Sequence, residues 1–138
     1  MSRTGGVAAL SVMIALSLAF FATSARAVDA AQPIRIRYTA PPGCPNSLQF
    51  FWLVRSRTDR VRLAAVTELA VPISVDLLPN ATGVVGTLGL PPVGGELFQR
   101  RVEARSCAEV VVALSLIVAL AFDPDAASAV PAPAAHFP

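Results

Sequence analysis

The pattern of apolar and polar residues divides the chain into short strands and two helices. Strict alternation over residues 34–38 predicts a strand with one apolar face. Residues 71–77 alternate again, and Pro72 places this strand near its start or at a sheet edge. Residues 84–90 and 96–104 predict two more strands, because turn sequences rich in proline and glycine separate them.

Apolar residues at helical spacing follow the first strand. Pro45 suits the first turn of a helix, so we expect a helix over residues 45–58. Its buried face would hold Ser47, Phe50, Phe51, Val54 and Thr58. Leu48, Trp52 and Leu53 fall off that face. Trp52 and Leu53 would form a contact surface beside Arg55 and Arg57, unless the tryptophan folds back over the edge of the domain. Residues 59–70 are ambiguous between a continued helix and a loop.

The most apolar stretch outside the N-terminus is residues 110–122. Ser106 and Glu109 match a capping box, and Asp123-Pro124 would stop a helix, which predicts a helix from residue 107 to 122. Thirteen uninterrupted apolar residues give about 20 Å of helix against roughly 30 Å of hydrocarbon, too short to span a bilayer. On a helical wheel, Ser115 and Ala119 fall on the side away from the core.

These elements predict an α+β fold in the order β-α-β-β-β-α. We expect an antiparallel sheet of about four strands over residues 34–124, with two helices on one face. Residues 125–138, rich in alanine and proline, are typical of a linker or tail.

The N-terminus has the three parts of a secretory signal peptide. Arg3 supplies the charge, residues 7–22 the apolar run, and Ala25-Arg-Ala27 the cleavage site. Cleavage after Ala27 is expected, with residues 28–30 as a second choice; an uncleaved anchor is the alternative, because the run is about long enough to span a bilayer. We therefore expect a periplasmic or secreted protein without a stable transmembrane segment.

The charge of the mature chain differs from that of the precursor. Arg3 and Arg26 leave with the signal, so nine arginines face nine acidic residues and the net charge falls from +2 to zero. The basic pI therefore describes the precursor, and the neutral mature chain gives no reason to expect a nucleic-acid partner.

Cys44 and Cys107 both lie in the mature chain, which favours one disulfide in an exported protein. Such a bridge would close a loop of 63 residues, worth about 4 kcal/mol. Both cysteines fall at helix N-termini, which meet if the helices run side by side in one direction. Two cysteines and the lone His136 do not suffice for a zinc site.

Residue types for catalysis are sparse. His136, the one histidine, lies in the tail, which leaves Ser-His-Asp and Cys-His chemistry without a general base in the folded part. Asp76 and Glu96 could lie on neighbouring strands, but solvated carboxylates are the more usual case. The spacing of Gly83, Gly86 and Gly89 favours bulges or bends. The sequence predicts no catalytic residue, metal or cofactor.

A partner surface is the remaining candidate site. Arginines follow the exposed Trp52-Leu53 pair and could bind an acidic partner, anionic glycans or lipid headgroups: Arg55, Arg57, Arg60 and Arg62. The alternative is that they complement the helix C-terminus and aid solubility. The sequence Asn80-Ala-Thr82 matches a glycosylation signal but is also ordinary turn chemistry.

The cysteine contexts resemble those of an exported domain that recurs in myxobacterial cell-envelope proteins. The matching segments are Gly43-Cys44-Pro45, Ser106-Cys107-Ala-Glu-Val110 and Ala121-Phe-Asp-Pro124, and the resemblance covers about residues 34–124. The family has no assigned activity to carry over. Its Pro/Ala-rich linkers lead into a further region that is commonly envelope-associated, and this chain ends within its linker, as a truncated member would.

These observations favour a non-catalytic exported module that binds a protein partner or a cell-wall component. The alternative is a periplasmic hydrolase or a thiol-redox protein. A redox role would require an exposed sulfur and an oxidising potential at Cys44 and Cys107.

Overall fold

The structure, a computed structural model, describes residues 30–93 and 96–128. In chain order the elements are β1 (Gln32–Thr39), α1 (Ser47–Arg55), β2 (Val61–Leu63), β3 (Val71–Asn80), β4 (Gly83–Val93), β5 (Glu96–Ala104), α2 (Cys107–Phe122) and the 3-10 helix η1 (Pro124–Ser128). The expected signal peptide and the tail from residue 129 on, with His136, lie outside the described residues.

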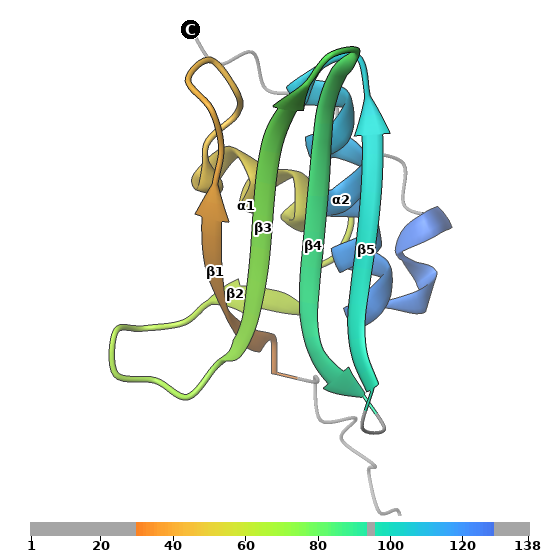
Figure 1. Cartoon of the computed structure of the whole chain (residues 1–138). Helices are drawn as coiled ribbons and strands as arrows, with labels where there is room; N and C mark the ends of the chain where they lie inside the picture. Colours follow the sequence, from red (N-terminus) through yellow and green to blue (C-terminus); the bar gives the residue numbers. More distant parts are fainter. Residues whose placement is uncertain (1–29, 94–95, 129–138) are drawn as a thin grey trace, which may run out of the picture.

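One sheet of five strands, in the order β2-β1-β3-β4-β5, carries α1 and α2 on one face (Figure 1). The α+β class and the placement of the helices are thus confirmed. The strand count and the purely antiparallel arrangement are wrong. The ambiguous segment 59–70 contains β2, and β1 pairs in parallel with both β2 and β3, while β3, β4 and β5 form an antiparallel meander.

Helix α1 starts later and ends earlier than the sequence predicts. Pro45 lies before the helix rather than in its first turn, and Asn46 is the N-cap: the Asn46 side chain accepts from the Gln49 N–H at 2.9 Å, and the Gln49 side chain accepts from the Asn46 N–H at 2.8 Å. The helix ends at Arg55. Four of the five residues expected on its buried face are buried, namely Phe50, Phe51, Val54 and Thr58; Ser47 is exposed.

Helix α2 has the predicted bounds and capping box, with Ser106 and Glu109 as the reciprocal pair. Its predicted orientation is wrong in one respect, since Ser115 and Ala119, expected on the side away from the core, are buried. Ser115 tolerates burial because its hydroxyl donates to the Val112 carbonyl at 2.8 Å. Within the described part of the chain, no helix has the length and apolar character needed to cross a membrane.

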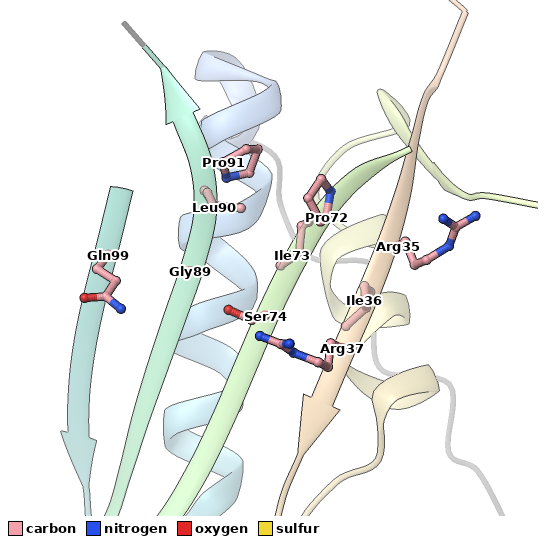
Figure 2. Close-up of a pocket in the computed structure, with 10 residues that line it drawn as sticks. All are labelled: Arg35, Ile36, Arg37, Pro72, Ile73, Ser74, Gly89, Leu90, Pro91 and Gln99. Carbon is pink, nitrogen blue, oxygen red and sulfur yellow. The ribbon is translucent and has the colours of Figure 1, made fainter. Parts of the chain in front are cut away.

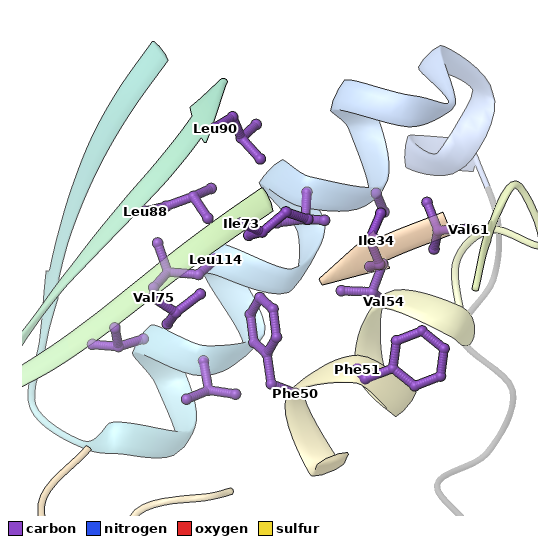
Figure 3. Packing of buried hydrophobic residues seen from close by; sticks show 14 of the residues in the cluster. Ile34, Phe50, Phe51, Val54, Val61, Ile73, Val75, Leu88, Leu90 and Leu114 are labelled. Carbon is purple, nitrogen blue, oxygen red and sulfur yellow. The ribbon is translucent and has the colours of Figure 1, made fainter. Parts of the chain in front are cut away.

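The core lies between the sheet and the two helices. Alternate strand residues such as Ile34, Ile73 and Leu88 are fully or almost fully buried and face Phe50 of α1 and Leu114 of α2 (Figure 3). The glycines of β4 do not mark bulges as expected, because the register is continuous from residue 84 to 90 and shifts only between Leu90 and Val93.

The two helices are fastened to each other at both ends. The predicted disulfide joins Cys44 to Cys107 beside the helix N-termini, with the Cα atoms 5.3 Å apart. Beyond the C-termini, the Thr58 hydroxyl donates to the Asp123 carboxylate at 2.9 Å, and the Arg60 guanidinium lies 3.6 Å from the same carboxylate. These links hold the helices parallel.

Candidate functional site

The segment between β2 and β3 is the most distinctive surface feature of the described chain. We call residues 64–70 the 64–70 loop. It connects two strands that flank β1 on opposite sides, and it projects beyond the β1–β2 side of the sheet (Figure 1). The Ala64 N–H donates to the Ile34 carbonyl at 2.9 Å, so the loop is joined to β1 where it begins.

Arg35 of β1 fixes the path of this loop. Its Nη2 donates to three loop carbonyls: Ala65 at 3.0 Å, Val66 at 3.3 Å and Glu68 at 2.9 Å. A planar guanidinium presents its donors in a rigid geometry, and hydrogen bonds from a charged donor are stronger than neutral ones. One side chain thus orients three backbone carbonyls of the loop.

Glu68 holds the loop from its other side. Its carboxylate accepts two hydrogen bonds from Arg62 of β2, one of them Nη1 to Oε2 at 2.7 Å, and one from the Ala65 N–H at 3.0 Å. The bond from Arg62 lowers the pKa of the Glu68 carboxyl from 4.5 to about 2, with a further contribution from the Ala65 N–H. At neutral pH the Glu68 carboxyl is therefore ionised, as its pairing with Arg62 requires.

The loop nevertheless turns apolar side chains into solvent. Val66 is 95% exposed and Leu69 is 93% exposed, and Leu63 at the end of β2 is 44% exposed. Single exposed apolar residues are ordinary. Two almost fully exposed branched residues on a segment that Arg35 and Glu68 hold in place are typical of a contact surface.

Sequence reasoning missed this site. The segment Ala64-Ala-Val-Thr-Glu-Leu-Ala70 has neither helical nor strand periodicity and was ambiguous. The one usable signal was Glu68, the single charged residue between Arg62 and Asp76. The partners of Glu68 come from two different strands, and Arg35 lies about thirty positions away in the sequence. These contacts can therefore be recognised only when the arrangement of the strands is known.

The apolar pair predicted as a contact surface is only partly exposed. Trp52 is 52% exposed and lies with its ring centroid 5.6 Å from that of Phe51, so it neither stands free nor folds fully over the domain. Leu48, one turn earlier, is equally exposed. Leu53 is partly buried and packs against the core.

Three of the four clustered arginines have partners within the domain. Arg55 Nη1 donates to the carbonyls of Asp59 and Val61, at 2.9 and 3.0 Å, just past the end of α1. Arg60 pairs with Asp123 and Arg62 with Glu68, while Arg57 is partly buried. These contacts agree with the alternative, a role at the helix C-terminus, and a role in binding a partner stays a prediction.

The face of the sheet opposite the helices carries a shallow depression. Its floor contains Ser74 and Gly89 on neighbouring strands, and Gln99 borders it on β5. Arg37 lies over β3 toward Ser74, whereas Arg35 points the other way (Figure 2). Its polar groups are few and widely spaced, and we assign it no chemistry.

Asp76 and Glu96, which could have lain on neighbouring strands, do not form a pair, because β4 separates their strands β3 and β5. Pairing places Asp76 level with Thr87 and Glu96 level with Val93, at different heights of the sheet. Asn80 forms a turn, since its side-chain oxygen accepts from the Thr82 N–H at 3.0 Å. Over residues 30–93 and 96–128, no three His, Cys, Asp or Glu side chains gather as a metal site would require.

Comparison of the chain with protein-family models, with curated protein sequences and with solved structures finds no match.

Proposed function

We propose that this chain is a non-catalytic, exported binding module of the cell envelope, which docks onto a partner protein through the 64–70 loop. The observation that carries the proposal is the contrast within this loop. Arg35 and Glu68 hold the loop through six hydrogen bonds, four to its backbone atoms and two between the side chains of Glu68 and Arg62, and yet Val66 and Leu69 remain in solvent.

The physical argument is preorganisation. Ordering a flexible loop on binding costs free energy, and a loop that is already held in its bound shape avoids most of that cost. Burying one branched apolar side chain contributes about 1.5–3 kcal/mol, so Val66 and Leu69 together could supply roughly 3–6 kcal/mol. Two such anchors fit the hot-spot pattern, in which a few buried side chains carry most of an interface.

The chemistry of the pair favours a protein partner over a cell-wall polysaccharide. Val66 and Leu69 can contribute binding free energy only when they are removed from water, and this requires an apolar pocket of matching size. Packed protein surfaces offer such pockets, whereas a hydrated glycan chain offers few. The arginines that suit an anionic glycan are mostly engaged within the domain.

Export is supported by two features together. They are the predicted signal peptide and the Cys44–Cys107 disulfide. Disulfides form and persist in oxidising compartments, so the bridge is compatible with a periplasmic or secreted protein. The resemblance to an exported envelope domain points to the same compartment.

Site-specific photo-crosslinking in the native cell envelope tests the proposal. A photoreactive residue at position 67, which is exposed between the two anchors and leaves both in place, should give one discrete protein adduct. The same residue at position 82, in the turn between β3 and β4 at the other end of the sheet, should not give that adduct. Leu69→Ser should abolish the adduct at position 67.

A matched variant separates docking from folding. Leu69→Ser and Val112→Ser both remove an exposed apolar side chain, and both should change the free energy of unfolding by less than about 1 kcal/mol. Only Leu69→Ser should remove the adduct. Equal labelling from positions 67 and 82, an adduct with lipid alone, or an adduct insensitive to Leu69→Ser contradicts the proposal.

A further inference from the structure

The sheet ends in a strand whose outer edge is available for pairing. Strand β5 spans nine residues and pairs with β4 on one side only, and no described strand lies on its other side (Figure 1). The opposite edge of the sheet, β2, has three residues. A long edge strand presents a row of backbone donors and acceptors to any strand that approaches it.

The side chains of β5 separate onto two faces. Val102 is paired with Gly86 and Arg100 with Leu88, which places these residues on the helix side of the sheet. Arg101 and Glu103 lie on the open side and form an ion pair with each other at 2.7 Å. Both are well exposed, with 68% and 56% of their side-chain surface accessible, so the domain shields neither charge.

We propose that β5 pairs edge to edge with β5 of a second copy of this chain, in an antiparallel register centred on Val102. A two-fold axis perpendicular to the sheet then places Val102 opposite its own counterpart. It places Arg101 opposite the partner's Glu103 and Glu103 opposite the partner's Arg101. Opposite charges directly across an antiparallel pair are stabilising, and this register creates two such pairs at once.

Charge selects this register over its neighbours. Centring the axis on Arg101 or on Arg100 places that arginine against its own copy. Centring it on Glu103 places two carboxylates face to face and also sets Arg101 against the partner's Arg105. Like charges directly opposite are destabilising, and among the registers centred on residues 100–103 only the one centred on Val102 avoids them.

The contact is small. With β5 ending at Ala104, this register pairs residues 100–104 of each copy. An interface of this size belongs to the weak class, so association should depend on protein concentration. The helices of both copies would lie on the same side of one continuous sheet, because a two-fold axis perpendicular to the sheet preserves its faces.

Charge reversal at the two positions provides the test, with sedimentation equilibrium of the mature, disulfide-bonded chain as the readout. The unaltered chain should dimerise reversibly below about 1 mM. Arg101→Glu alone and Glu103→Arg alone should each weaken association at least tenfold, because each sets like charges against each other. An equimolar mixture of the two single variants should associate again, since the introduced carboxylate then faces the introduced guanidinium.

The mixture distinguishes the dimer contact from a local effect. Both single variants lose the ion pair within the strand, and mixing cannot restore it, so recovery reports on the contact between copies. Both residues are exposed, and the melting temperatures should stay nearly unchanged. A chain that is monomeric up to about 1 mM, dimerisation unaffected by either reversal, or a mixture that stays monomeric overturns the proposal.

Discussion

Helix α2 lies so close to β4 that one position in the strand excludes any side chain. A Cβ atom added at Gly86 would lie 2.3 Å from Cγ1 of Val110 and 2.8 Å from Cδ1 of Leu114. Carbon atoms in ordinary contact are about 3.5–4.0 Å apart, so Gly86→Ala forces α2 or its side chains to move by about 1 Å. Overpacking a core costs about 1–3 kcal/mol, and we expect the upper part of that range because both neighbours are fully buried.

The control is Gly89→Ala, three residues further along β4 on the open face. Its Cβ would meet only Ser74, with the hydroxyl oxygen at 2.5 Å, and that hydroxyl can rotate away. We expect this variant to lower the free energy of unfolding by less than about 1 kcal/mol. Denaturant unfolding gives both values, and thermal melting should separate the variants by roughly 4–8 °C per kcal/mol.

A compensating change completes the test. Val110→Ala removes the atom nearest to the new Cβ, so the double variant Gly86→Ala/Val110→Ala should be more stable than the sum of the single effects predicts, by about 0.5–3 kcal/mol. Strict additivity, or a Gly86→Ala variant as stable as Gly89→Ala, would refute the packing argument.

Three further outcomes are expected. Replacing Cys44 and Cys107 together by alanine should lower the free energy of unfolding by about 4 kcal/mol, because the bridge closes a 63-residue loop, and a denaturant titration checks this. Asn46→Ala should cost about 1 kcal/mol by loss of the α1 cap, whereas Asn46→Gly should cost only a few tenths; equal losses would argue against the cap. The pKa of Glu68 is depressed on folding to about 2, so its contribution to stability is complete above pH 4.5 and is lost as the pH falls toward 2. Glu68→Gln should therefore flatten the decline of stability in that window, and an unchanged pH profile would contradict the Arg62–Glu68 pairing.

Local sequence signals predicted the elements that depend on local chemistry. Ser106 and Glu109 determine the start of α2 through hydrogen bonds three residues apart, and this spacing is visible in the sequence. Alternation from Ile34 to Tyr38 likewise predicts β1, because successive residues of a strand point to opposite faces of the sheet. The disulfide was predicted from the exported compartment and from the presence of two cysteines, and the parallel helices make it geometrically possible.

The sheet topology and the candidate site depend on contacts that no local pattern records. Strand β2 has three residues, too few for a periodic signal, and its pairing with β1 makes the sheet mixed. The arginines illustrate the same limit. Arg62 belongs to the cluster that was predicted to bind a partner, but it forms an ion pair with Glu68. No role was predicted for Arg35, and yet it holds the 64–70 loop.

Backbone amide ¹⁵N relaxation tests the central claim most directly, because docking by the 64–70 loop rests on the loop being rigid before any partner arrives. The amides of Val66, Thr67 and Glu68 should have order parameters near 0.85, like those of the strands, and should fall below about 0.6 in Arg35→Ala. Order parameters below about 0.6 for these amides in the unaltered chain would contradict the account.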